Sequence, residues 1–197
     1  MTQRNLLEVD WSRIPAPADD GGAAHLKGMT LPPVSLLATD DTSVALSALR
    51  GRTVVFAYPR TGEPGKIALV DDWDMIPGAR GCTPQTCAFR DLFAELKAAG
   101  AAQVFGLSTQ SNAYQTEMAS RLHLPFPVLS DDKLALTRAL NLPTMEVAGL
   151  TLIKRLALIV DDARITHVFY PVFPPDRNAG DVLDWLKGNA ATGSSKD

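Results

Sequence analysis

The chain has 197 residues, 46% of them hydrophobic, which is enough to bury the core of a single domain. The formal net charge is −3 and the basic residues are dispersed, so nothing indicates a nucleic-acid-binding protein. No apolar run approaches the length of a transmembrane helix, the first residues lack the apolar core of a signal peptide, and two cysteines do not form a secreted disulfide framework. We therefore expect a cytoplasmic protein that binds neither nucleic acid nor a membrane.

Residues 1–28 are expected to form an N-terminal extension, because prolines and a Gly-Gly turn signal interrupt any regular element. Trp11 and Ile14 would attach this extension to the body of the protein. A partly ordered arm is an equally good interpretation. The body is expected to span residues 29–188, followed by a polar tail over residues 189–197.

Strands are predicted where short apolar runs occur, and helices where apolar residues recur at helical spacing. The two kinds of element alternate along the body, and a hairpin followed by a helix closes it. This order predicts an α/β fold in which helices flank a central mixed β-sheet. The expected strands are 34–37, 53–58, 103–107, 127–129, 156–160 and 164–169, and the expected helices are 84–99, 112–122, 133–140 and 179–186.

The only two cysteines lie five residues apart, where the helix over 84–99 is expected to begin. Thr83 is the expected N-cap of this helix, and Pro84 suits its first turn. A cysteine at a helix start lies at the positive end of the helix dipole and near free backbone N–H groups, both of which favour the thiolate. Cys82 is therefore a candidate nucleophile, and Cys87 is a candidate to resolve the species that Cys82 forms.

The spacing of the two sulfurs argues against a permanent disulfide. The apolar residues from Phe89 to Leu96 share one face of the predicted helix, whereas Cys87 projects to roughly the opposite face, which makes a packing role for it less natural. In a continuous helix the two α-carbons would lie about 9 Å apart, whereas a disulfide requires about 7 Å or less. A bond between the cysteines therefore requires the first turn to unwind, as a transient catalytic disulfide can do.

Other interpretations of the cysteine pair are weaker. Two buried, inert cysteines are the usual case in a cytosolic protein. A zinc site requires four ligands, and the three histidines His25, His123 and His167 lie far away in sequence without ligand spacing. A thioredoxin-type reductase requires Cys-x-x-Cys, whereas four residues separate these two cysteines. We expect neither a metal nor a bound cofactor.

The segment Gly81-Cys82-Thr83-Pro84-Gln85-Thr86-Cys87-Ala88-Phe89-Arg90-Asp91 resembles the active-site helix of the peroxiredoxins, specifically those of the bacterioferritin-comigratory-protein or peroxiredoxin Q type. The resemblance covers roughly residues 30 to 188. It implies a thioredoxin-like fold and a peroxidase that reduces hydrogen peroxide and organic hydroperoxides without a bound cofactor. Further similar segments occur at residues 31–36, 51–59, 106–108 and 124–131.

The resemblance also implies roles for individual residues. Cys82 matches the peroxidatic cysteine and Cys87 the resolving cysteine, which together would form an intramolecular disulfide that thioredoxin, glutaredoxin or glutathione reduces. Arg155 matches the arginine that lies beside the peroxidatic sulfur, although an ordinary solvated charge at a strand end is the alternative. Proteins that resemble this chain are often monomers, so we expect a monomer or a weak homodimer.

The chain departs from the family's pattern before Cys82. The family carries a Pro-x-x-x-Thr-x-x-Cys phrase around the peroxide pocket, whereas Ala79 occupies the position of that threonine here. The nearest matches are Pro59 and Thr61, separated from Cys82 by an insertion over residues 62–80, and Thr61 would reach the sulfur if this loop folds back. The insertion is expected to screen the peroxide pocket or to form a partner contact.

Two other classes of function stay open on the sequence. A redox sensor that passes oxidation to a partner protein would share Cys82 but would turn over poorly with thioredoxin. A thioredoxin-fold binding module would carry its cysteines incidentally. Peroxide consumption coupled to a thioredoxin system separates a peroxidase from both.

Overall fold

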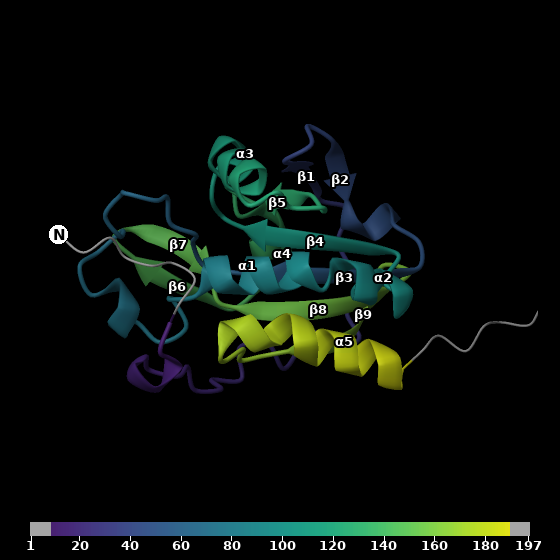
Figure 1. Ribbon diagram of the computed structural model, residues 1–197. Coiled ribbons are helices and arrows are strands. Elements are labelled where there is room, and N and C mark those ends of the chain that lie inside the picture. The colour runs from purple at the N-terminus through teal and green to yellow at the C-terminus, as the bar shows by residue number, and fades with distance from the viewer. Residues whose placement is uncertain (1–8, 190–197) are drawn as a thin grey trace, which may run out of the picture.

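The computed structural model describes residues 9–189, and a seven-stranded mixed β-sheet forms its centre (Figure 1). Short runs of buried apolar residues form the middle strands, as the sequence predicts. The strands of this sheet are β1 (Ser35–Ala38), β2 (Ser43–Ala45), β3 (Arg52–Ala57), β4 (Gln103–Ser108), β5 (Val128–Ser130), β8 (Leu156–Asp161) and β9 (Arg164–Phe169).

The strand order is β2-β1-β5-β4-β3-β8-β9. β3, β4 and β5 run parallel to one another, whereas β1 and β8 pair antiparallel with β5 and β3. Helices lie on both faces of the sheet, so the predicted central mixed sheet with flanking helices is confirmed. The helices are α1 (Cys82–Asp91), α2 (Phe93–Ala98), α3 (Asn112–Arg121), α4 (Ala135–Leu140) and α5 (Asn178–Gly188), with 3₁₀ turns η1 (Trp11–Arg13), η2 (Leu46–Ala48), η3 (Trp73–Met75) and η4 (Pro175–Arg177).

Alternate side chains of β3 enter two separate cores, because successive strand residues point to opposite faces of a sheet. Val54 and Phe56 lie in the core that α1, α2, α3 and α5 cover. Val55 and Ala57 lie in the core on the other face, which α4 covers together with part of the N-terminal extension. The strand that leads toward the cysteine helix is thus fixed from both sides.

The structure differs from the sequence-based expectation in three places. One is the short edge strand β2, which was not expected. The single helix expected over 84–99 is divided at Leu92, whose φ and ψ of −97° and 9° are not helical, so it forms α1 and α2. Two further strands, β6 (Thr144–Val147) and β7 (Leu150–Ile153), form a separate hairpin that was not expected. The pattern in this region is weak because each strand has only four residues and an exposed or half-buried outer end.

The described part of the N-terminal extension packs on the body. Ala23 and Leu26 are buried in the core that α4 covers, and Lys154 donates a hydrogen bond to Asp20. Trp11, which was expected to attach the extension, does contact the body through Asp176. The expected polar tail lies outside the described residues beyond residue 189.

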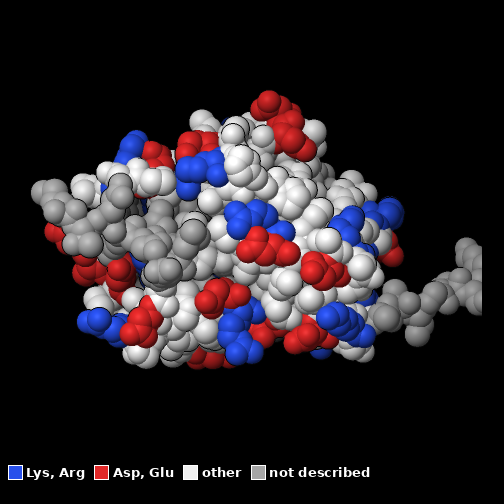
Figure 2. Space-filling view, viewed as in Figure 1, with Lys and Arg blue, Asp and Glu red and all other residues white. Residues whose placement is uncertain are grey.

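Acidic and basic side chains are interspersed over the face shown in Figure 2, with no continuous basic stripe. Within residues 9–189, no helix has the length and apolar character needed to cross a lipid bilayer.

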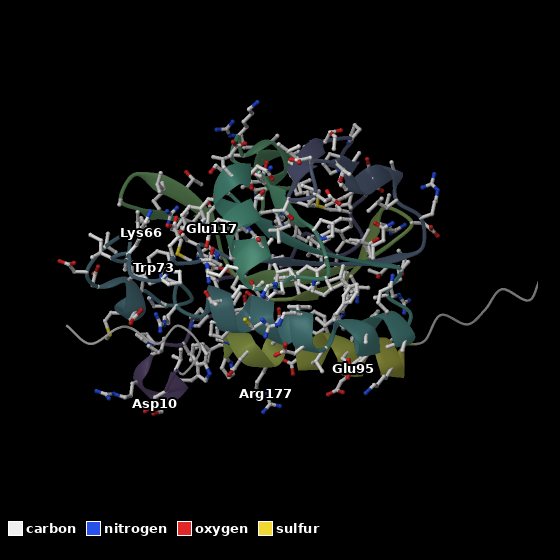
Figure 3. The ribbon with its side chains drawn as sticks, turned by 45° about the horizontal axis from the view of Figure 1, so that its top comes forward. Asp10, Lys66, Trp73, Glu95, Glu117 and Arg177 are labelled. Carbon is white, nitrogen blue, oxygen red and sulfur yellow. The ribbon has the colours of Figure 1, made fainter. Side chains whose placement is uncertain are left out.

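The insertion over residues 62–80 is folded against the β6–β7 hairpin. Trp73 of η3 is 7% exposed and packs with Ala79, Val147 and Leu152 in a small third core. Figure 3 shows Trp73 and Lys66 at the end of the molecule where this hairpin lies. The insertion therefore forms a wall at one end of the molecule, next to the start of α1.

Candidate active site

The helix that carries both cysteines begins at Cys82 itself. Its N-cap is Gly81, whose φ of 104° lies in the left-handed region that glycine adopts without steric cost. The expectation that Thr83 caps this helix is therefore wrong: the chain turns into the helix two residues earlier, and Thr83 lies in the first turn. Cys82 is 3% exposed, and its thiol lies 3.5 Å from the carbonyl oxygen of Ala79.

Arg155 lies between β7 and β8 and reaches the sulfur of Cys82. Its Nη2 donates to Cys82 Sγ at 3.2 Å and is 3.1–3.3 Å from the carbonyl oxygens of Gly78, Ala79 and Arg80. The side chain is 2% exposed, so the alternative of a solvated charge at a strand end is wrong. A guanidinium at this distance stabilises a thiolate, and the carbonyl oxygens compensate part of its lost hydration.

A residue that sequence reasoning missed connects this arginine to the rest of the fold. Gln85, which is fully buried in the first turn of α1, accepts a hydrogen bond from Arg155 Nη1 and donates to Asn178 Oδ1 at 2.9 Å. Asn178 is the first residue of α5. The Gln85 amide thus holds the arginine side chain in place and joins α1 to α5. No local pattern in the sequence predicts a contact between residues so far apart.

Cys87 lies on the same helix but is buried, with 7% exposure, in the core that contains Phe56 and Phe89. The expectation that Cys87 has little packing role is therefore wrong. Cys87 is buried because neighbouring elements cover α1 on several sides. All residues from Cys82 to Cys87 are buried, whichever side of the helix they lie on. Burial raises the pKa of the Cys87 thiol, although Arg90 opposes this in part.

Both cysteines are free thiols, and α1 is helical from Cys82 through Cys87. Ideal helix geometry separates their α-carbons by about 9 Å, which exceeds the roughly 7 Å that a disulfide spans. The structure is thus that of a reduced site, in which the first turn of α1 has to unwind before the two sulfurs can bond.

The hydrogen bonds of Thr61 and Pro59 are made with residues other than Cys82. The Thr61 hydroxyl donates to Gln110 Oε1 at 3.1 Å, and its N–H donates to the same oxygen at 2.9 Å. The Pro59 carbonyl oxygen accepts from Ser108 Oγ at 3.3 Å. The expectation that the Thr61 hydroxyl donates to Cys82 is therefore wrong in this structure, because this hydroxyl donates to Gln110.

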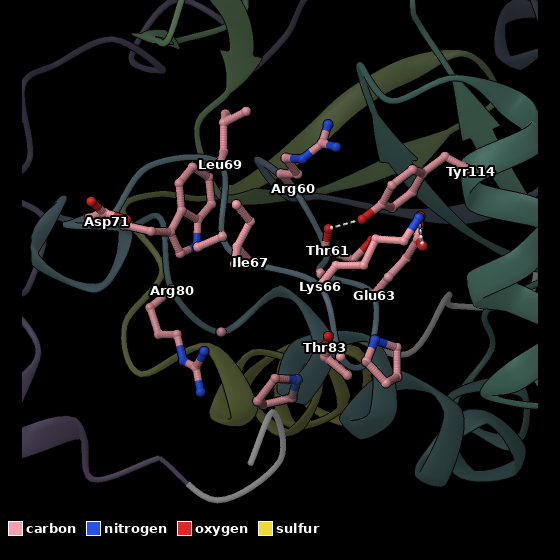
Figure 4. A pocket seen from close by; sticks show the side chains of 17 residues that line it. Arg60, Thr61, Glu63, Lys66, Ile67, Leu69, Asp71, Arg80, Thr83 and Tyr114 are labelled. Atoms are coloured by element: carbon pink, nitrogen blue, oxygen red, sulfur yellow. Dashed lines mark hydrogen bonds and ion pairs between the residues drawn. The ribbon is translucent and has the colours of Figure 1, made fainter. Parts of the chain in front are cut away.

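A cavity of about 780 Å³ lies between the insertion and the start of α1 (Figure 4). Thr61, Gly81, Thr83 and Pro84 line it, so it borders both neighbours of Cys82 without including Cys82 itself. Its other walls are mixed in chemistry, with apolar and cationic groups. These walls include Arg60, whose guanidinium lies 4.8 Å from the ring centre of Tyr114, and Lys66, Leu69, Trp73 and Tyr114.

Comparison with known proteins places these features in a family. The model of the Redoxin family matches residues 26–183. The chain is 31% identical over 163 residues to the chloroplastic peroxiredoxin Q of Sedum lineare, covering 82% of this chain and 77% of that protein. It is also 31% identical over 163 residues to the chloroplastic peroxiredoxin Q of Oryza sativa subsp. japonica, covering 82% of this chain but only 66% of that protein.

Solved structures agree with this assignment. The Mycobacterium tuberculosis peroxidoxin BcpB superposes with a TM-score of 0.66 at 26% identity, covering 83% of this chain and 98% of that one. The Xanthomonas campestris bacterioferritin comigratory protein superposes with a TM-score of 0.65 at 23% identity, covering 84% and 98%, and shows the shared fold. The chain therefore belongs to the redoxin family, as a peroxiredoxin of the peroxiredoxin Q or bacterioferritin-comigratory-protein type.

Proposed function

We propose that this protein is a thiol-dependent peroxidase in which Cys82 attacks the peroxide and Cys87 resolves the product. The observation that carries this proposal is the buried Arg155 guanidinium, 3.2 Å from Cys82 Sγ at the first residue of a helix. The partners of this arginine are carbonyl oxygens, the Gln85 amide and the sulfur. None of these oxygens carries a full negative charge, so the guanidinium is available to stabilise the negative charge of a nucleophilic sulfur.

In the first step the Cys82 thiolate attacks one oxygen of the peroxide. The S–O bond forms and the O–O bond breaks, so the sulfur loses two electrons and the peroxide gains them. The leaving hydroxide or alkoxide takes a proton and departs as water or an alcohol, and Cys82 becomes a sulfenic acid. Arg155 and the N–H groups of the first turn, which have no acceptor within the helix, stabilise the developing negative charge.

In the second step Cys87 resolves the sulfenic acid. The first turn of α1 unwinds, which brings the two sulfurs together and removes Cys87 from the apolar core that raises its pKa. The Cys87 thiolate attacks the Cys82 sulfur, the S–S bond forms, the S–O bond breaks, and the oxygen leaves as water after protonation.

An external thiol then reduces the disulfide by exchange and restores both free thiols. Thioredoxin, glutaredoxin and glutathione are the candidate reductants, and the cycle needs no resident cofactor. We place the protein in a reducing compartment such as the cytoplasm, because the cycle has to return to the dithiol. A monomer or weak homodimer suffices, since both cysteines lie on one helix of one chain.

We further propose that the insertion over residues 62–80 selects among peroxides. It supplies most of the wall of the 780 Å³ cavity, which ends at Gly81 and Thr83 on either side of the nucleophile. Apolar groups such as Leu69 and Trp73 in that wall suit the organic part of an alkyl hydroperoxide.

A coupled assay tests the proposal. Peroxide consumption linked to a thioredoxin system is measured for the parent protein and for Cys82→Ser and Cys87→Ser. The parent is expected to turn over, Cys82→Ser is expected to be inactive, and Cys87→Ser is expected to react once and stop. Oxidation of Cys82 without turnover by any of the three reductants would instead identify a redox relay protein, and no reaction with peroxide would identify a binding module.

A further inference from the structure

Gly81, the residue before the nucleophile, is in contact with two rings from distant parts of the chain. A methyl group on its α-carbon would lie 2.7 Å from Cη2 of Trp11 and 2.6 Å from Cγ of Pro175. Carbon atoms in ordinary contact stay about 3.5–4 Å apart, so both rings already touch the backbone of this glycine. The point where the chain enters α1 is therefore held from outside the helix.

Trp11 is itself fixed by the segment around η4. Its Nε1 donates to Asp176 Oδ2 at 2.9 Å, and its ring meets that of Phe173 edge to face, with centroids 6.0 Å apart. Figure 3 shows their neighbours Asp10 and Arg177 along the same edge of the molecule. We call this arrangement the Trp11 clamp, defined by Trp11, Phe173, Pro175 and Asp176 around Gly81.

The clamp acts on the part of the helix that has to move. The first helical hydrogen bond runs from the Gln85 N–H to the Gly81 carbonyl oxygen at 3.0 Å, so unwinding the first turn displaces Gly81. Displacing Gly81 separates its backbone from the two rings that touch it. The folded first turn therefore keeps the clamp contacts, and the unwound first turn loses them.

We propose that Trp11 is a positioning residue for the peroxidase reaction, which holds the first turn of α1 folded while Cys82 reacts and slows its unwinding toward Cys87. This inference rests on the proposed function, since it concerns the second step of that cycle. Trp11 touches neither sulfur and acts through Gly81. The N-terminal extension thus influences the rate of the reaction, although it contributes none of the reacting groups.

The two steps should respond differently to loss of the ring. In Trp11→Ala the first turn unwinds more readily, because the contact between the indole ring and Gly81 is missing. Disulfide formation is therefore expected to be faster by about two- to fivefold, the value of a few carbon–carbon contacts expressed as a rate. The reaction with peroxide occurs in the folded form, which still predominates, so its rate is expected to fall by less than about twofold. A general loss of stability would not accelerate one step alone.

Stopped-flow measurement of sulfenic acid formation and of disulfide formation tests this split. Trp11→Phe lacks Cη2, the atom nearest Gly81, and the Nε1 donor to Asp176, so its rate of disulfide formation is expected to lie between those of the parent and Trp11→Ala. Arg13→Ala is the matched control, because Arg13 lies in the same 3₁₀ turn and is exposed. Disulfide formation in Trp11→Ala at the parent's rate or slower would overturn the proposal.

A second measurement uses the parent protein, so it holds even if Trp11→Ala does not fold. Hydrogen exchange is compared for the reduced protein and for the disulfide form made with diamide, which requires no peroxidase activity. The N–H groups of Arg13 and Ile14 donate to the carbonyl oxygens of Asp10 and Trp11 at 3.1 and 3.2 Å, and they are expected to exchange faster after oxidation. Unchanged exchange there would overturn the clamp and leave the peroxidase intact, whereas unreactive Cys82 in the coupled assay would reject the peroxidase itself.

Discussion

Replacement of Arg155 by methionine tests the arrangement around the sulfur most severely. Methionine is of similar length and apolar, so it removes the guanidinium and leaves Gln85 and the carbonyl oxygens of Gly78, Ala79 and Arg80 without their donor. Each buried acceptor that is left unsatisfied in this way costs about 1–3 kcal/mol of folding stability. The loss of one preorganised donor at the reacting centre lowers the rate about 10²–10³-fold.

The assay separates these two effects. Chemical denaturation gives the free energy of unfolding, and stopped-flow mixing with peroxide gives the rate of Cys82 oxidation under conditions where the variant is folded. Arg155→Lys keeps the charge but presents three donors instead of five, so its rate should lie between those of the parent and of Arg155→Met. Arg138→Met, an exposed arginine on α4, is the control and should behave as the parent. A folded Arg155→Met that oxidises within threefold of the parent would refute the reasoning.

Three further predictions concern the same end of the molecule. Gly81→Ala forces an L-residue into a φ of 104° and drives a methyl group into Trp11 and Pro175, so the free energy of unfolding should fall by at least about 1–2 kcal/mol. An unchanged midpoint of denaturant unfolding would contradict the close contact of Gly81 with these two rings. Burial raises the pKa of Cys87, so the folded reduced protein binds this proton more tightly than the unfolded chain does. The resulting stabilisation is complete below the free thiol's pKa of about 8.5 and is lost as the pH rises above it. In Cys87→Ala, the free energy of unfolding from a pH series of denaturation curves should therefore fall less steeply above that pH. Deletion of residues 64–77 removes most of the cavity wall and should change the ratio of rates for cumene hydroperoxide and hydrogen peroxide, whereas an equal ratio would argue against a selective insertion.

The sequence predicted those parts of the fold that local patterns determine. The apolar runs of β3, β4 and β8 appear where expected to within one residue, because central strands of a sheet are buried on both faces. The placement of both cysteines at the start of one helix was also predictable, since the local sequence around Pro84 favours a helix start.

The parts that were not predictable depend on contacts between distant segments. The start of α1 is set by the left-handed backbone of Gly81 against Trp11 and Pro175, and not by a side-chain cap at Thr83. Cys87 is buried because neighbouring elements cover α1 on sides that a helical wheel leaves open. The bond between Gln85 and Asn178 crosses 93 positions of the chain, and no spacing within either segment indicates it.

The most direct test of the account is mass spectrometry of the reduced protein after one equivalent of hydrogen peroxide. The parent should lose two hydrogen atoms and yield a peptide in which Cys82 and Cys87 are joined, whereas Cys87→Ser should gain one oxygen as a sulfenic acid at Cys82. Free thiols at Cys82 in both proteins after this treatment would contradict the claim that this sulfur is the one that reacts with peroxide.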